Sequence, residues 1–347
     1  MARDISEAWV AGHCALGMRV LRRAELSRRT FACWAVGSAA SPWSALAADE
    51  YPSRVIRLIV ASAPGSSPDV IARLVAAEMS LLLRQQVVVE NRVGASSIIG
   101  TNMVAKSVPD GYTVGYVTPT LVLNRALQMP APFDADRDLQ PVIRFGHQPL
   151  VLVVSSASPY NTLAEFISAA RNPANKLSYA STGLGSIFHL AAELFFQSTG
   201  TGAVHVPYTS GPQAINDMLG GRMDFMFNAL NVIVPQVRSG RLRALGVTSL
   251  NRSAALPEVP TLVEQGIKDC EVLTWGGLVA PARVPPDAIA TLNAAANAAL
   301  QALHVRQTLG DSGYEITGGT PATFRAFLQG ELDKWLQVVK RSDIQLR

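Results

Sequence analysis

Segments typical of strands and of helices alternate almost without a break from residue 51 onward. Short apolar runs are followed closely by stretches with the apolar period of a helix. Such alternation with short connections predicts parallel sheets covered by helices, the α/β class. We expect strands at 55–60, 87–89, 112–117, 150–155, 177–180, 203–206, 223–227, 242–248 and 272–279. Helices are expected at 69–83, 97–107, 162–171, 187–198, 212–219, 231–238, 260–266, 286–302 and 321–340.

Two of the strand-to-helix connections share a composition of Gly, Ser and other small residues. They cover residues 61–69 and residues 181–186. Small residues let the backbone approach a ligand, and a helix N-terminus offers unpaired N–H groups and a partial positive charge. In open α/β sheets, ligands bind beyond the carboxyl ends of the strands, where both loops are expected. We therefore expect the two loops to act as opposing jaws on one carboxylate-bearing molecule.

The serines of these loops also have a purely structural interpretation. Ser67 is placed as an N-cap with Pro68 at the first helical position, and Ser186 is a plausible N-cap before Ile187. Every helix needs a cap, so capping alone accounts for both serines, and the two roles can coexist. Asp69 can likewise serve only as an N-terminal charge that favours the helix dipole.

Net charge gives no indication of nucleic-acid binding. The 347 residues suffice for two domains and carry a formal charge of +4. Residues 1–47 hold six of the 30 basic residues and three of the 26 acidic ones, so the remaining 24 and 23 nearly cancel. No basic groove is implied.

The first 47 residues are typical of a cleaved export signal. Arginines ending in Ser27-Arg28-Arg29-Thr30-Phe31 precede a modest apolar stretch and the small-x-small site Ala45-Leu46-Ala47. The paired arginines resemble a twin-arginine signal, with an ordinary Sec leader as the alternative. Both interpretations place the protein in the periplasm, cleaved near Ala47. Because Cys14 and Cys33 belong to this region, Cys270 remains alone and is interpreted as a core residue rather than a reactive thiol.

The motifs of an enzyme are not found. The histidines lack partners at metal-ligand spacing, and neither a Walker loop nor a dinucleotide-binding glycine motif occurs. Residues 183–187 do not match the nucleophile elbow G-x-S-x-G. A Ser186–His189 dyad is doubtful, because both residues lie in one helical turn with His189 at the capping-box position. We therefore expect neither an enzyme, a metal nor a cofactor.

Ordered blocks over residues 50–343 resemble the Bug-type solute-binding proteins of tripartite tricarboxylate transporters. The blocks include Ala63-Pro64-Gly65 with Asp69 to Arg73, Pro109 to Thr113, Tyr179-Ala180-Ser181 with Gly183, Gly185-Ser186 and His189, Asp217 to Gly221, and Leu256 to Thr261. The resemblance implies a two-lobed periplasmic binding protein fold of type II-like topology, with two mostly parallel sheets flanked by helices and joined by two crossing strands. The crossings would fall near 150–155 and 273–279. One lobe would hold residues 51–150 plus 277–347, and the other residues 151–276.

The resemblance also implies the function. Such a protein captures a small organic carboxylate by hinge closure and delivers it to a membrane permease, acting as a monomer without nucleic acid. A periplasmic sensor for a membrane signalling partner is the alternative, and an exported hydrolase using Ser186 and His189 is a weaker one. The expected ligand-binding residues are Ala63, Pro64, Gly65, Ser66, Ser67, Asp69, Thr118, Ser181, Thr182, Gly183, Gly185, Ser186, His189 and Asn228.

Departures from the family pattern bear on ligand choice. Ser62 stands where an aromatic residue is common, and Ser66 and Ser67 partly replace a glycine pair. The loop at 91–97 lacks the usual proline and later glycines, so we expect it to be stiffer. Asn228 occupies a position that is commonly acidic, and loss of that charge weakens selection for an amine. We therefore expect a carboxylate ligand without an ammonium group.

Overall fold

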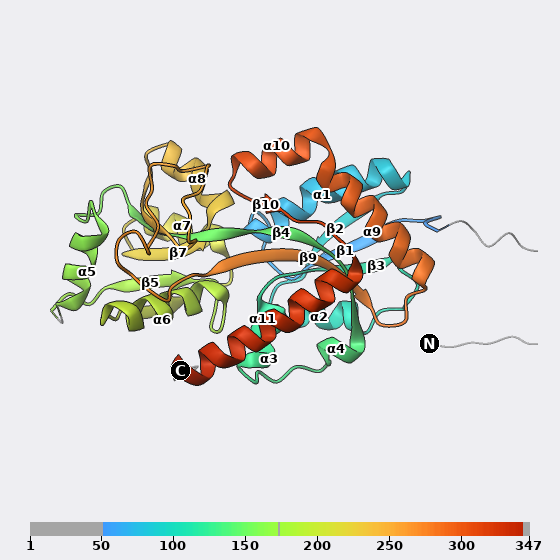
Figure 1. Ribbon diagram of the computed structural model, residues 1–347, viewed down its shortest axis with the longest axis horizontal. Helices are drawn as coiled ribbons and strands as arrows, with labels where there is room; N and C mark the ends of the chain where they lie inside the picture. The colour runs from blue at the N-terminus through green and yellow to red at the C-terminus, as the bar shows by residue number, and fades with distance from the viewer. Residues whose placement is uncertain (1–50, 173, 343–347) are drawn as a thin grey trace, which may run out of the picture. The chain divides into compact units, whose positions relative to one another are not determined.

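The computed structural model describes residues 51–342 apart from residue 173 (Figure 1). The expected signal at 1–47, with Cys14 and Cys33, lies outside the described residues. Within the described part, no helix is long and apolar enough to cross a membrane. The strands are β1 (Ile56–Val60), β2 (Val87–Asn91), β3 (Thr113–Val117), β4 (Leu139–Ser155), β5 (Ser178–Ser181), β6 (Val204–Pro207), β7 (Phe225–Ala229), β8 (Leu242–Val247), β9 (Leu273–Pro281) and β10 (Glu315–Ile316). The helices are α1 (Ser67–Leu83), α2 (Ile98–Ala105), α3 (Thr120–Ala126), α4 (Ala135–Asp138), α5 (Leu163–Arg171), α6 (Ile187–Thr199), α7 (Gly211–Leu219), α8 (Leu230–Arg238), α9 (Pro286–Gln301), α10 (Leu303–Asp311) and α11 (Pro321–Ser342).

The central strand β4 belongs to two groups of strands. Up to Pro149 it pairs antiparallel with β9, and the order continues through β3 and β1 to β2. From Leu150 it pairs with β7 and β8, and the order continues from β7 through β5 to β6. We call the first group, with β10, sheet A and the second group sheet B. Strands β1 to β3 are parallel to one another, as are β5 to β7. The predicted α/β class is confirmed, but both sheets are mixed rather than mostly parallel, because β4, β8, β9 and β10 pair antiparallel with their neighbours.

Two strands carry the chain between the sheets, as predicted. Figure 1 shows β4 and β9 side by side through the middle of the molecule, in agreement with their pairing. The chain enters β9 from sheet B, because the Val272 N–H donates to the carbonyl of Thr248 just after β8. β4 is much longer than the predicted strand at 150–155, which covers only its second part.

The missed part of β4 has a composition that argues against a strand. Pro141, Gly146 and Pro149 interrupt it, and proline cannot donate to a strand ladder. The structure accommodates this by register shifts between Pro141 and Ile143 and between Arg144 and Gly146. Glycine is required at position 146, where β10 pairs with β4, because a Cβ there would lie 2.1 Å from the carbonyl oxygen of Glu315.

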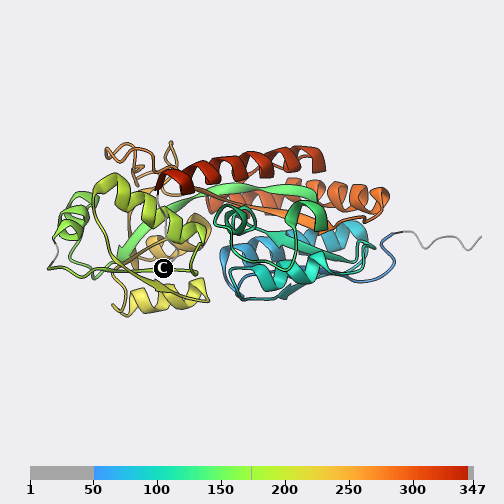
Figure 2. The same cartoon turned by 90° about the horizontal axis from the view of Figure 1, so that it is seen from below.

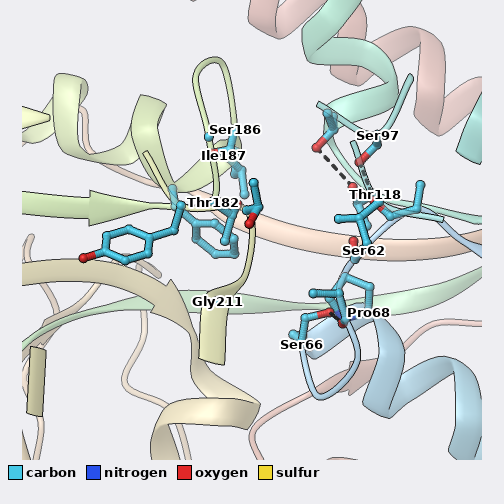
Figure 3. A pocket seen from close by; sticks show the side chains of 18 of the residues that line it. Ser62, Ser66, Pro68, Ser97, Thr118, Thr182, Ser186, Ile187 and Gly211 are labelled. Carbon is cyan, nitrogen blue, oxygen red and sulfur yellow. Dashed lines mark hydrogen bonds between the residues drawn. The ribbon is translucent and has the colours of Figure 1, made fainter. Parts of the chain in front are cut away.

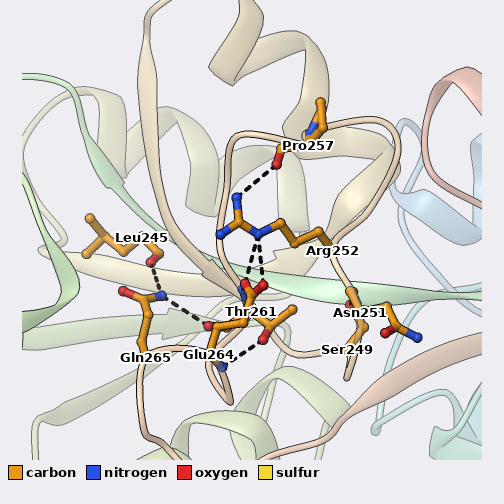
Figure 4. A network of polar contacts seen from close by, with 8 residues as sticks. All are labelled: Leu245, Ser249, Asn251, Arg252, Pro257, Thr261, Glu264 and Gln265. Atoms are coloured by element: carbon orange, nitrogen blue, oxygen red, sulfur yellow. Dashed lines mark hydrogen bonds and ion pairs between the residues drawn. The ribbon is translucent and has the colours of Figure 1, made fainter.

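The helix predicted at 260–266 is wrong. Its start signals are genuine, because the Thr261 N–H donates to Glu264 Oε2 (2.7 Å) and the Glu264 N–H donates to Thr261 Oγ1 (3.0 Å). Figure 4 shows this turn held by Arg252, which pairs with Glu264, and by Gln265. Gly266 has φ +86° and ends the segment after a single turn.

Helices cover both faces of the sheets and enclose three apolar clusters (Figures 1 and 2). One cluster joins sheet A to α1 and α9, and another joins sheet B to α7 and α8. The third extends along both sheets beneath α6 and α11. Cys270 is buried in the third cluster, as predicted, and burial raises the pKa of its thiol to about 12. The third cluster therefore gives the two sheets a shared apolar core.

Candidate functional site

A cavity of about 360 Å³ lies between sheets A and B. Its walls come mainly from the segments that follow β1, β2, β3, β5, β6 and β7, at the carboxyl ends of parallel strands. In Figure 3, Ser62, Ser66 and Thr118 lie on one side, and Thr182, Ser186 and Gly211 lie on the other. The expected site residues that line the cavity are Ala63, Gly65, Ser66, Ser67, Thr118, Thr182, Gly183, Ser186 and Asn228.

The remaining expected residues are not on the cavity wall. They are Pro64, Asp69, Ser181, Gly185 and His189. Four of them, all but Pro64, make hydrogen bonds that shape the two Gly/Ser loops, as described below.

The loop before α1 differs from the prediction by one residue at its cap. Ser66 is the N-cap, with the extended φ of −73° and ψ of 162°, and Ser67 and Pro68 are the first two helical residues. Ser66 Oγ does not cap the helix but donates to the carbonyl of Ala63 (2.6 Å), which tightens the loop. This local turn is the reason why the helix begins one residue earlier than the pattern suggested.

Asp69 is the hydrogen-bonding centre that holds this loop. Its Oδ2 accepts the N–H of Gly65 (2.8 Å), and its Oδ1 accepts Asn91 Nδ2 (2.8 Å) and Arg73 Nε (3.0 Å). Burial alone would raise the pKa of Asp69, but the hydrogen bonds from Arg73, the Gly65 N–H and Asn91 outweigh burial and hold the pKa below its ordinary value. An ionised carboxylate that does not itself line the cavity therefore holds the backbone of the first loop in place.

The loop before α6 has the predicted cap. Ser186 is the N-cap, and its Oγ accepts the N–H of His189 (3.3 Å). The Gly185 N–H donates to Nδ1 of His189 (3.2 Å), and the Gly183 N–H donates to Ser181 Oγ (3.1 Å). The second loop is thus held by an imidazole and a hydroxyl.

A cluster of stacked rings, in which Tyr179 and His189 are buried and His205 is partly exposed, supports the second loop. The rings of His189 and His205 stack with centroids 4.3 Å apart, and Tyr179 stacks on His205 at 4.8 Å. Ser181 Oγ lies 2.6 Å from Nε2 of His205, and Tyr179 donates to Glu193. Burial lowers the pKa of each histidine to about 4. Both imidazoles are therefore neutral near pH 7.

The contacts of Ser186 and His189 do not form a catalytic dyad. The contact between them is the backbone N–H of His189 to Ser186 Oγ, whereas Nδ1 of the ring accepts from Gly185. The other ring nitrogen lies 3.7 Å from Glu193. A general base must reach the proton that it removes, and this imidazole faces away from the serine.

Within the described part of the chain, six helices begin at the cavity. The first residues or caps of α1, α2, α3, α6, α7 and α8 all lie on its wall. Among the described residues that line it, none is Asp, Glu, Lys, Arg or His. The N–H groups of a first helical turn lack intrahelical acceptors and carry partial positive charge. The cavity is therefore an environment suited to an anion, although no ionised side chain contributes to it.

A third loop, residues 93–97, was not among the expected site residues. Ala95, Ser96 and Ser97 have positive φ angles of 45°, 50° and 69°, which non-glycine residues seldom adopt. Ser97 Oγ donates to Ala61, and Asn124 donates to the carbonyl of Ser96. The composition predicted a stiff loop, but residues 95–97 contain no glycine, so nothing in the sequence indicates three consecutive left-handed residues.

Two contacts join the walls of the cavity. Ser96 Oγ donates to the carbonyl of Leu184 in the second loop (3.1 Å). Gln148 is buried in β4, where Nε2 donates to Ser67 Oγ (2.9 Å) and Oε1 accepts the Asn231 N–H (2.8 Å). This amide links the starts of α1 and α8 at the point where β4 passes between the sheets. A single glutamine inside a strand gives no sequence signal for this role.

Comparisons with known proteins fit this geometry. A family model described as "Tripartite tricarboxylate transporter family receptor" matches residues 71–344. Protein BugT of Bordetella pertussis (strain Tohama I / ATCC BAA-589 / NCTC 13251) is 35% identical over 304 residues, which cover 87% of this chain and 93% of BugT.

Solved structures give the same result. An R. palustris protein solved with adipate has a TM-score of 0.82 at 32% identity, covering 85% of this chain and 99% of the other. MatC from Rhodopseudomonas palustris, solved with bound malate, has a TM-score of 0.79 at 30% identity, covering 83% of this chain and all (100%) of MatC. The resemblance found in the sequence is confirmed, and the chain belongs to the tripartite tricarboxylate transporter receptors, a family of periplasmic solute-binding proteins.

Proposed function

We propose that this protein binds a small organic carboxylate without an ammonium group and delivers it to the membrane permease of a tripartite tricarboxylate-type transporter. The observation that carries the proposal is the set of six helix starts around one cavity without ionised side chains. The relatives solved with malate and adipate support a carboxylate ligand. A buried ammonium group needs an acidic partner, and no Asp or Glu is among the described lining residues.

The two Gly/Ser loops supply the proposed carboxylate contacts. Ser67 and Thr182, with the first N–H groups of α1 and α6, would donate to the carboxylate oxygens from opposite walls. Asp69, Ser181, Gly185 and His189 would act indirectly, by holding these loops in place. Asn228 lies on the wall as a neutral amide, and its Oδ1 accepts the Ala229 N–H (2.7 Å).

The two sheets correspond to the lobes in this proposal, with residues 51–150 plus 277–347 in one and 151–276 in the other. Ligand binding would close the lobes about β4 and β9, because the closed form brings both loops to the carboxylate. We further propose that residues 1–47 direct export through a signal of the twin-arginine or the Sec type that is cleaved near Ala47, and that the mature protein acts as a monomer.

A thermal-unfolding screen of the purified protein against organic carboxylates tests the binding function. A ligand that binds only the folded state raises the unfolding midpoint, by an amount that grows with the ratio of its concentration to the Kd. We expect at least one simple carboxylate to raise the midpoint, and we expect aspartate and glutamate not to do so. A wide panel without any shift contradicts the proposal, as does a shift confined to amino acids.

A pair of matched variants locates the binding. Thr182→Trp fills the cavity from the second loop and should abolish the shift. Thr308→Trp places the same side chain at an exposed position on α10 and should leave the shift intact. Equal shifts in both variants would place the carboxylate outside this cavity.

A further inference from the structure

One part of the cavity is lined by apolar side chains. Phe188, Pro207, Tyr208, Pro212, Ile215 and Val232 line it, and we call these six residues the apolar wall. They come from the start of α6, the end of β6, the connection that follows β6, and the helices α7 and α8, which all belong to the sheet B side. Four of them, the aromatic residues, Ile215 and Val232, join the apolar clusters below them. The cavity therefore has a polar side at the two Gly/Ser loops and an apolar side next to it.

Two residues of the apolar wall, Tyr208 and Pro212, have little hydrogen-bonding capacity left for a ligand. Tyr208 contributes to the wall, but its hydroxyl donates to Asp217 (2.9 Å), which also pairs with Arg222. Pro212 stands in the first turn of α7, where it offers no N–H and approaches Gly65 of the first loop. A ligand group that contacts these six side chains meets mainly carbon atoms, although Thr209 and the starts of α7 and α8 also line the cavity.

The polar and apolar sides of the cavity favour a ligand with one carboxylate over a ligand with two. The loops before α1 and α6 provide hydroxyls, and the first turns of these two helices provide N–H groups without intrahelical acceptors, for a single carboxylate. A second carboxylate at the apolar wall would lose its hydration without gaining a cation, since no Lys, Arg or His is among the described lining residues. Among the described residues that line the cavity, Asn228 carries the one side-chain amide, and a neutral amide does not balance a full charge.

We propose, on the basis of the proposed function, that the preferred ligand is a monocarboxylate with an apolar body. The carboxylate lies between the two Gly/Ser loops, and an alkyl chain or aromatic ring covers the apolar wall. Removal of that apolar surface from water supplies the affinity. This class of ligand differs from malate and adipate, the diacids with which two relatives were solved.

Matched pairs of probes test the proposal by isothermal titration calorimetry at pH 7. Hexanoate differs from adipate only by a methyl group in place of the second carboxylate, and 4-methylbenzoate differs from terephthalate in the same way. We expect the monoacid of at least one pair to bind tenfold or more tightly than its diacid, and neither diacid to bind more tightly than its partner. Equal affinities, tighter binding of a diacid, or binding of only short polar acids such as malate would overturn the proposal. Failure of every carboxylate to bind would instead contradict the proposed function.

Two variants of α8 test the position of the apolar body. Val232→Thr keeps the shape of the side chain but puts a hydroxyl on the apolar wall, and it should weaken the preferred monoacid about threefold or more. Val237→Thr makes the same change at a partly buried position of the same helix outside the cavity, and should leave the affinity unchanged. Thermal midpoints measured without ligand separate folding effects from binding. Equal affinities in the two variants would overturn the proposed placement.

Discussion

The two Gly/Ser loops have nearly the same geometry but different supports. Gly65 and Gly185 have φ angles of +74° and +72°, and each donates its N–H to a side chain four residues later. That side chain is the carboxylate of Asp69 in the first loop and the imidazole of His189 in the second. Ser66 and Ser186 occupy the equivalent cap positions. One loop shape can therefore be held by a charged group or by a neutral one, and the two differ in their response to substitution and to pH.

Loss of the charged support is expected to have the largest effect. Asp69→Ala removes the acceptor of the Gly65 N–H and one acceptor each of Asn91 and Arg73, which keep the Ser62 carbonyl and Asn91 Oδ1. A hydrogen bond to a charged group contributes about 1.5–3 kcal/mol. We expect the free energy of unfolding to fall by about 2–4 kcal/mol, measured by urea titration. Asp136→Ala removes an exposed carboxylate that pairs with Arg125 and should cost less than about 1 kcal/mol. Similar costs for both would show that Asp69 does not hold the loop.

The second-largest effect is expected from lowering the pH, which should distinguish the Asp69 carboxylate from the His189 imidazole. Because the pKa of His189 is lowered to about 4 in the folded protein, the unfolded chain binds the proton first as the pH falls below about 6.5. Stability is then lost between about pH 6.5 and pH 4, with a slope of at most about 1.4 kcal/mol per pH unit for this group. Asp69 stays ionised in both states over most of this window, since its folded pKa is lowered, and its contribution declines only at lower pH.

The variant His189→Gln removes this titration. We expect its free energy of unfolding to be lower at pH 7 and to change less between pH 6.5 and pH 4 than that of the unaltered protein. Urea titrations at four pH values measure both slopes. Parallel curves would contradict the assignment of a neutral buried imidazole to the second loop.

The shared glycines should have a smaller effect on stability and a clear effect on binding. Gly65→Ala and Gly185→Ala each place a Cβ in the left-handed region, at about 1–2 kcal/mol. We expect either change to weaken the preferred carboxylate at least tenfold, measured by calorimetry, because the N–H groups of the loop shift. Gly221→Ala has a similar φ of +71° outside the cavity and should cost comparable stability without loss of binding. Unchanged carboxylate affinity in both loop variants would contradict the shared role of Gly65 and Gly185 in positioning the N–H groups of the loops.

The smallest effect should come from the contact between the walls. Ser96→Ala removes the hydrogen bond to the carbonyl of Leu184, for which we expect a loss of about 0.5–1.5 kcal/mol, or two- to tenfold in carboxylate affinity. Ser107→Ala removes a local hydrogen bond to Val104 and serves as the control. If both variants bind as tightly as the unaltered protein, the contact does not contribute to the bound form.

Local signals in the sequence predict the fold class and the two Gly/Ser loops well. Strand, small residues and helix follow one another within each unit, so each signal lies in one short stretch. The first part of β4 was missed because Pro141, Gly146 and Pro149 are tolerated only through long-range pairing with β9 and β10. The predicted helix at 260–266 failed because a good start signal precedes Gly266 by too few residues.

The rest of the cavity depends on contacts between distant segments. The left-handed run at 95–97 is held by Ala61 and Asn124, and the orientation of Tyr208 depends on Asp217. The role of Gln148 exists only because α1 and α8 start on either side of β4. No periodicity or motif encodes these placements, so the apolar wall became visible only in the folded chain.

The most direct test of the central claim compares a carboxylate with its neutral analogue. The carboxylate that binds most tightly in the panel and the carboxamide of the same shape are titrated into the protein by calorimetry at pH 7. If helix starts and hydroxyls from both loops bind the negative charge, the carboxylate binds with one-to-one stoichiometry and at least tenfold more tightly than the amide, a difference of about 1.4 kcal/mol or more. Equal binding of the two would contradict an anion site between the two Gly/Ser loops.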